Sequence, residues 1–161
     1  MPKLSTGQCQ ALRELERIAD HLSCAVEIIS HHQQDNGWLN TELRLDCTGI
    51  PRTKGGLSLR DSERFIVLFP SDFPFKIPSV WVRHIRFAGS AHVQWKRHLC
   101  LYQSPATEWV PAGGAFGFLD RLWDWIRKGA KGELDPVGGP LHPPAVYTSS
   151  SLRFVVAKAD A

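Results

Sequence analysis

Three prolines at four-residue spacing, Pro70, Pro74 and Pro78, restrict the fold of this chain more than any other feature of its sequence. Proline has no backbone N–H and a fixed φ angle, so residues 69–80 cannot form a regular helix or a central strand. We therefore expect an extended, stiff connection between two regular elements. Its phenylalanine side chains must then pack against other parts of the chain.

The patterns on either side of this connection are typical of an α+β fold. Residues 5–21 carry apolar side chains at spacings of three and four, which predicts an amphipathic helix with Ser5 or Thr6 as its N-cap. A second helix is expected over residues 116–128, where Gly129 and Gly132 are stop signals. Four stretches rich in strand-forming residues predict an antiparallel meander that the first helix covers, at residues 24–29, 38–47, 64–69 and 80–85.

The stretch from His92 to Tyr102 combines a cysteine with nearby histidines. Cys100 follows His98 by two positions and His92 by eight. A thiolate is a nucleophile, and a neighbouring imidazole can lower the pKa of the thiol or move its proton. In extended backbone the side chains of His98 and Cys100 point to one face. The stretch is therefore a candidate site of thiol chemistry.

Four motifs, in the same order, resemble those of ubiquitin-conjugating enzymes. Residues 69–80, F-P-S-D-F-P-F-K-I-P-S-V, are similar to that family's F-P-x-x-Y-P-F-x-x-P-x-V segment. The others are Leu99-Cys100-Leu101, then Trp109-Val110-Pro111 before a helix, then residues 139–143, which are similar to the family's D-P-L-x-P loop. The resemblance covers about residues 5–144. It implies an N-terminal helix, a four-stranded antiparallel meander, an active-site loop, a central helix and a truncated C-terminal helical region. We expect a single domain over residues 1–161, with 145–161 as a C-terminal extension.

The resemblance implies that Cys100 carries the C-terminal glycine of another protein as a thioester and passes it to a lysine amine. It implies three protein partners, namely the acyl donor, the target with its lysine and, where one exists, an activating enzyme, but no cofactor and no metal. The string L-C-L-Y-x6-W-x-P looks most like bacterial members of the superfamily from CBASS antiphage operons. In those operons the donor is a cGAS-like nucleotidyltransferase or a bacterial ubiquitin-like protein.

Two departures from the family pattern affect the expected chemistry. His92 stands where the family has an asparagine that stabilises the oxyanion or its loop, so His92 is a candidate replacement donor. Gly139 stands where the family has an acidic residue, and the nearest substitutes are His142 and Asp135. His98 could tune the thiolate or be a solvated loop histidine. Trp109 and Pro111 are expected to buttress the loop.

Several other interpretations of the same residues stay open. Cys100 could be a packing thiol, and His92 a structural histidine that bonds a backbone carbonyl. A zinc site from His92, His98 and Cys100 would lack a fourth ligand. The whole chain could be a non-catalytic binding module, or adaptor, with the same fold. A Cys-His hydrolase would need an orienting acid and a nucleophile elbow that the sequence does not show.

The whole sequence excludes several broad classes. The net charge is +3 and no run of five or six like charges exists, so nucleic acid is not expected as the main partner. The longest apolar run, residues 65–69, is too short to span a bilayer, and the first residues lack the apolar core of a signal peptide. Four widely spaced cysteines without a C-x-x-C pair argue against a zinc ribbon or a disulfide scaffold. We expect a cytoplasmic protein without a membrane partner.

Overall fold

In the computed structural model, which describes residues 3–22 and 24–135, the first regular element is α1 (Thr6–His21). Ser5 caps this helix: its hydroxyl accepts the Gln8 N–H and its own N–H donates to the Gln8 side chain, both at 3.1 Å. This reciprocal capping box fixes the start of the helix. The apolar stripe that predicted the helix, including Leu15, lies in the core. The prediction for residues 5–21 is confirmed.

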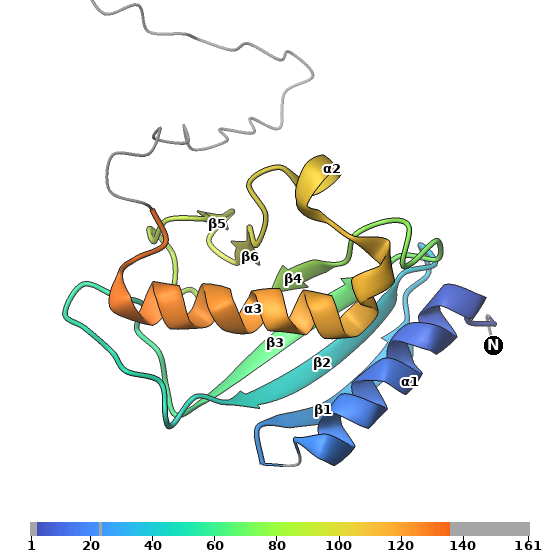
Figure 1. Cartoon of the computed structure of the whole chain (residues 1–161), viewed down its shortest axis with the longest axis horizontal. Helices are drawn as coiled ribbons and strands as arrows, with labels where there is room; N and C mark the ends of the chain where they lie inside the picture. The colour runs from blue at the N-terminus through green and yellow to red at the C-terminus, as the bar shows by residue number, and fades with distance from the viewer. Residues whose placement is uncertain (1–2, 23, 136–161) are drawn as a thin grey trace, which may run out of the picture.

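Six antiparallel strands form one sheet in the order β1-β2-β3-β4-β6-β5 (Figure 1). The predicted four-strand meander is confirmed, with β1 running past its expected end at residue 29. The register is continuous between β2 and β3, where Leu43 faces Phe65. The strand bounds are β1 (Val26–Gln33), β2 (Leu39–Asp46), β3 (Ser62–Phe69), β4 (Ser79–Trp81), β5 (Val93–Gln94) and β6 (His98–Leu99).

The prediction that the fourth strand runs to residue 85 is wrong, because β4 ends at Trp81. The chain turns after Val82, and Phe87 is fully buried with the His84 ring edge-on against it. Burial of the Phe87 side chain removes apolar surface from water and stabilises this turned path of the chain. The sheet continues instead through the short β5–β6 hairpin, where the sequence predicts a loop.

The proline-rich connection is not extended throughout, which corrects a second prediction. Residues 71–75 form turns in which the Phe73 and Phe75 N–H groups donate to Pro70 O and Asp72 O at 3.2 and 2.9 Å. Phe73 is buried edge-on against Phe69, with ring centroids 5.2 Å apart. Phe75 is 83% exposed, so not every phenylalanine packs against the chain as expected.

Helix α3 (Gly114–Lys131) lies on the same face of the sheet as α1 (Figure 1). It follows two short helices, α2 (Pro105–Glu108) and η1 (Pro111–Gly113). Glu14 of α1 accepts the Ala115 N–H at 2.6 Å, and this carboxylate suits the positive end of the helix dipole. The helix therefore begins two residues before its predicted start. It ends at Gly132, whose φ is +74°, whereas the other predicted stop, Gly129, is buried within it.

Three of the sequence predictions lie outside the described residues. They concern Gly139, His142 and the truncated C-terminal region with the extension at 145–161. Among residues 3–22 and 24–135, no helix has the length and apolar character needed to cross a membrane.

Candidate active site

The β5–β6 hairpin brings Cys100 next to His92. The Cys100 backbone N–H donates to the His92 carbonyl oxygen at 2.8 Å, immediately after β6. The hairpin turn has positive φ at both central residues, Trp95 at +45° and Lys96 at +65°, which is the geometry of a type I′ turn. His92 itself has φ of +60°. Two residues eight positions apart in sequence are thereby held side by side.

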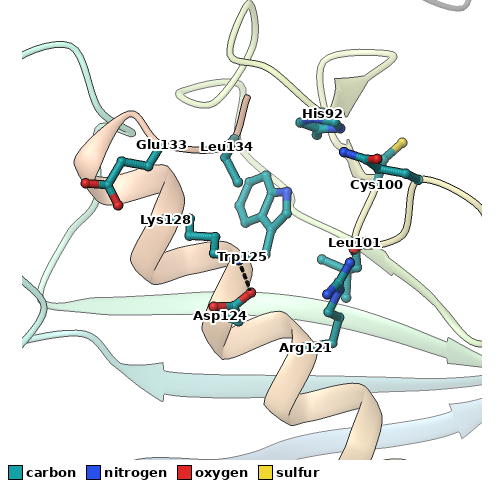
Figure 2. A pocket seen from close by; sticks show the side chains of 10 residues that line it. His92, Cys100, Leu101, Arg121, Asp124, Trp125, Lys128, Glu133 and Leu134 are labelled. Carbon is teal, nitrogen blue, oxygen red and sulfur yellow. Dashed lines mark hydrogen bonds and ion pairs between the residues drawn. The ribbon is translucent and has the colours of Figure 1, made fainter. Parts of the chain in front are cut away.

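A pocket of about 290 Å³ lies between this loop and α3. Figure 2 shows His92 and Cys100 on the loop side, with the α3 side chains opposite and the sulfur of Cys100 directed away from α3. Both apolar and charged groups line the pocket, so it suits a peptide better than a wholly apolar ligand. The lining residues are His92, Cys100, Leu101, Gln103, Arg121, Asp124, Trp125, Lys128, Glu133 and Leu134.

The Cys100 thiol is half-buried, and burial raises its pKa above the ordinary value. Desolvation disfavours the charged thiolate, so the resting group is the neutral thiol. Its Sγ atom lies 3.9 Å from Nδ1 of His98. The contact shows that the two side chains do point to one face, as their spacing predicts.

His98 is held in an aromatic cage, defined here as Trp81 and Trp95. The two indole rings stack at 6.0 Å, and the His98 ring lies 4.7 Å from Trp81 and 5.5 Å from Trp95 between centroids. Desolvation in this setting lowers the pKa of His98. The idea of a solvated loop histidine is therefore wrong, since His98 lies in β6 and is half-buried.

His92 contacts a carboxylate instead of an aromatic ring. Its Nε2 atom lies 2.9 Å from Oδ1 of Asp135, and the His92 side chain is 12% exposed. Because an ionised carboxylate only accepts hydrogen bonds, Nε2 carries the hydrogen. The two residues that the sequence analysis named separately, as replacements for the asparagine and for the acidic group, thus form one pair.

Arg121 of α3 holds the loop that follows Cys100. Its Nε donates to the Leu101 carbonyl oxygen at 2.8 Å, and its guanidinium pairs with Glu108 at 2.7 Å. The same guanidinium lies over the Tyr102 ring, 5.2 Å from its centroid. The sequence analysis missed this residue. In the sequence, Arg121 is an arginine on the helix face opposite the apolar stripe. An ordinary solvated side chain has the same pattern, so the sequence alone does not mark it as part of a site.

Trp109 and Pro111 lie away from the pocket. The Trp109 indole N–H donates to the Pro74 carbonyl oxygen at 2.8 Å, and its ring lies 6.3 Å from that of Phe73. Pro111 begins η1, where its missing N–H has no consequence. These contacts join the active-site loop to the proline-rich connection.

Two further observations concern polar groups near the pocket. Trp125 is 4% exposed, and its indole N–H has no hydrogen-bond partner among the residues that the structure describes. Such an orphaned donor is uncommon in a folded protein. No three His, Cys, Asp or Glu side chains within the described part of the chain are placed to hold a metal ion. His92, His98 and Cys100 are therefore not arranged as a zinc site.

In a comparison with known families, the sequence matches prokaryotic E2 family A over residues 11–159. The chain belongs to prokaryotic E2 family A. No curated protein sequence matches it. Membership agrees with the resemblance to ubiquitin-conjugating enzymes that the motifs carry, and with the α+β fold of helix, antiparallel sheet and helix.

Membership in the E2 family supports a ubiquitin-conjugating-like role in general, with protein partners such as an activating enzyme and a ubiquitin-like protein. In this E2 the active-site loop contains the β5–β6 hairpin, and the pocket faces α3. Sequence reasoning named Cys100, His92 and His98, which the structure brings together with Asp135. It did not find Arg121 or Trp125 as parts of the site.

Proposed function

We propose that this E2 carries the C-terminal glycine of a protein as a thioester on Cys100 and transfers it to a lysine amine. The observation that carries the proposal is the position of Cys100 at a polar pocket beside the His92–Asp135 pair, on an E2 scaffold. A thioester keeps its carbonyl carbon reactive toward amines. The pocket lies beside Cys100, while the sulfur itself points away from α3 and is open to an incoming acyl group.

In the transfer step the lysine nitrogen bonds to the thioester carbonyl carbon and the carbon–sulfur bond then breaks. The attacking group is the neutral lysine amine, whose nitrogen must lose one proton as the bond forms, and His92 can take it because the Asp135 carboxylate stabilises the resulting imidazolium. The same pair can support the oxyanion that develops on the carbonyl oxygen. The proton returns to the leaving sulfur, so the products are an amide and the free thiol.

The nearest backbone donor is already engaged, which favours a side-chain donor for the oxyanion. The Cys100 N–H is already bonded to the His92 carbonyl oxygen, so it is not available to an oxyanion. A buried carbonyl oxygen that loses such a bond is left unsatisfied at a cost of about 1–3 kcal/mol. This is why we assign the oxyanion to His92 and not to the loop backbone.

We further propose that the donor is a bacterial protein ending in glycine, either a cGAS-like nucleotidyltransferase or a ubiquitin-like protein, and that the conjugation serves antiphage defence in the cytoplasm. The support is the L-C-L-Y-x6-W-x-P string around Cys100, which resembles bacterial members from CBASS operons. The reaction requires an activated form of that glycine.

The experiment is loading of the purified protein with the cognate glycine-ending donor and its activating enzyme. Wild type should form an adduct that a reducing agent removes, and Cys100→Ser should trap an oxyester that resists the reductant. Cys100→Ala should form none, while Cys24→Ser, which removes an exposed thiol, should behave as wild type. No adduct on wild type, or one that survives reduction, contradicts the thioester and leaves the adaptor function.

A further inference from the structure

The neutral resting state of Cys100 means that loading the thioester requires a proton acceptor. We propose that His98 is the catalytic base for loading, taking the proton from Cys100 Sγ as the sulfur attacks the activated acyl group. This inference rests on the proposed thioester function and adds a residue with a defined role to it. It assigns loading and transfer to different histidines.

The geometry places one ring nitrogen at the reacting atom. Nδ1 of His98 lies 3.9 Å from Cys100 Sγ, within the range of a sulfur hydrogen bond. The pairing of β6 with both β4 and β5 fixes the backbone of His98, and its ring packs against both indoles of the aromatic cage. A base must first be within reach of the proton that it abstracts, and this contact meets that condition.

The surroundings of His98 keep the ring in its basic form. Among the described residues, desolvation is the cause of its lowered pKa, and no charged group contributes. Trp81 and Trp95 face it from β4 and the hairpin turn, Cys100 is the titratable group that faces it, and Lys96 and Arg97 in the turn are exposed to solvent. At neutral pH His98 is therefore neutral and holds a lone pair for the thiol proton.

The proposed step is balanced in atoms and charge. The Sγ–carbon bond forms while the thiol proton passes to His98, and the bond between the acyl carbon and its leaving group then breaks. The co-reactant is an acyl thioester or acyl phosphate on the activating protein. Because the cage destabilises the imidazolium, the proton passes on to the departing thiolate or phosphate. His98 returns to its neutral form.

The test uses iodoacetamide as the probe and needs no partner protein. An ordinary thiol reacts through its thiolate, so its rate rises about tenfold per pH unit below its pKa. With His98 as base, the reactive form holds one proton shared between His98 and Cys100. The Cys100 rate should therefore show a pH-independent plateau, bounded below by the His98 pKa, which is lower than 6.5, and above by the Cys100 pKa, which exceeds 9.0.

Exposed Cys24 is the internal reference, and the two alkylation sites are separated by peptide mass spectrometry. His98→Phe keeps an aromatic ring in the cage but removes the nitrogen. It should replace the Cys100 plateau by a straight rise with pH and lower the Cys100 rate at pH 7 by roughly tenfold or more, with Cys24 unchanged. His98→Gln, which can bond the sulfur but cannot take up a proton, should do the same.

A Cys100 rate in wild type that rises in parallel with Cys24 from pH 5.5 to 8.5 overturns the proposal, and this measurement does not depend on whether a variant folds. Equal Cys100 rates in wild type and His98→Phe overturn it as well. If the plateau is present but the cognate donor never forms an adduct, the His98–Cys100 coupling stands and the conjugating function fails. The two inferences can thus be separated.

Discussion

The two histidines beside Cys100 are the same residue type in opposite surroundings. His98 lies beside two stacked indole rings, and desolvation by burial lowers its pKa. His92 lies on the loop side of the pocket with its Nε2 atom 2.9 Å from Oδ1 of Asp135. Desolvation favours the neutral ring of His98, whereas a hydrogen bond to a carboxylate orients the ring of His92. The difference suits His98 to brief acceptance of a proton from the thiol and gives His92 a ring orientation set by Asp135.

The comparison also shows that each histidine depends on a different part of the fold. The cage of His98 comes from β4 and the hairpin turn, within the sheet. The partner of His92 comes from the segment that follows α3, beyond the helix C-cap Gly132. A substitution in β4 or the hairpin turn should therefore slow loading more than transfer. A substitution in the segment after α3 should slow transfer more than loading.

Replacement of His92 is expected to have the largest effect on transfer. His92→Ala should slow discharge of the preloaded thioester to a lysine by about 100-fold, since general acid–base groups typically contribute 10²–10⁴-fold. Loading should change by no more than about twofold. Single-turnover assays measure the two steps separately, and His32→Ala on the exposed end of β1 is the control. Equal slowing of loading and transfer would contradict the division between the two histidines.

Replacement of Asp135 should have a smaller effect on the same step. Asp135→Asn keeps a hydrogen-bond acceptor but removes the charge that stabilises the His92 imidazolium, and we expect transfer to slow by about tenfold. Asp124→Asn is the matched control, because Asp124 lines the same pocket but pairs with Lys128 at 2.8 Å. If the two variants discharge at the same rate, Asp135 has no specific role toward His92.

The smallest effect on catalysis is expected from a substitution in the β5–β6 turn, which lies between His92 and His98 in the sequence. Lys96 has φ of +65°, a conformation that disfavours side chains other than glycine by about 1–2 kcal/mol. Lys96→Gly should raise the free energy of unfolding by about 1 kcal/mol in a urea titration, with loading and transfer unchanged. Lys128→Gly on α3 should lower stability by a similar amount. A destabilised Lys96→Gly variant would show that the turn is not strained.

Much of the fold could be predicted because local patterns and tertiary structure agree. The helix at α1 and the meander follow from apolar spacing and strand-forming residues. The β5–β6 hairpin was missed because its turn is Trp95-Lys96, where Asn-Gly is the usual signal. Trp95 stacks on Trp81 in the aromatic cage. This packing explains why a tryptophan stands at a turn position where asparagine or glycine is usual.

The site could be predicted only as far as a motif marks it. Cys100 and His92 stand at positions that the family motif identifies, and His98 follows from strand alternation. The partners of these residues come from distant parts of the chain: Asp135 lies 43 residues after His92, and Arg121 lies 20 residues after Leu101. No local pattern encodes such pairs, because they arise only when α3 is placed against the loop.

The left-handed backbone of His92 has an evolutionary consequence. A φ of +60° is uncommon outside glycine, and asparagine and histidine are among the residues that adopt it most readily. Asparagine is also the residue that the ubiquitin-conjugating enzymes use at this place in their motif. The genetic code separates histidine from asparagine by a single nucleotide. The backbone at position 92 therefore accommodates either residue without a change in the loop.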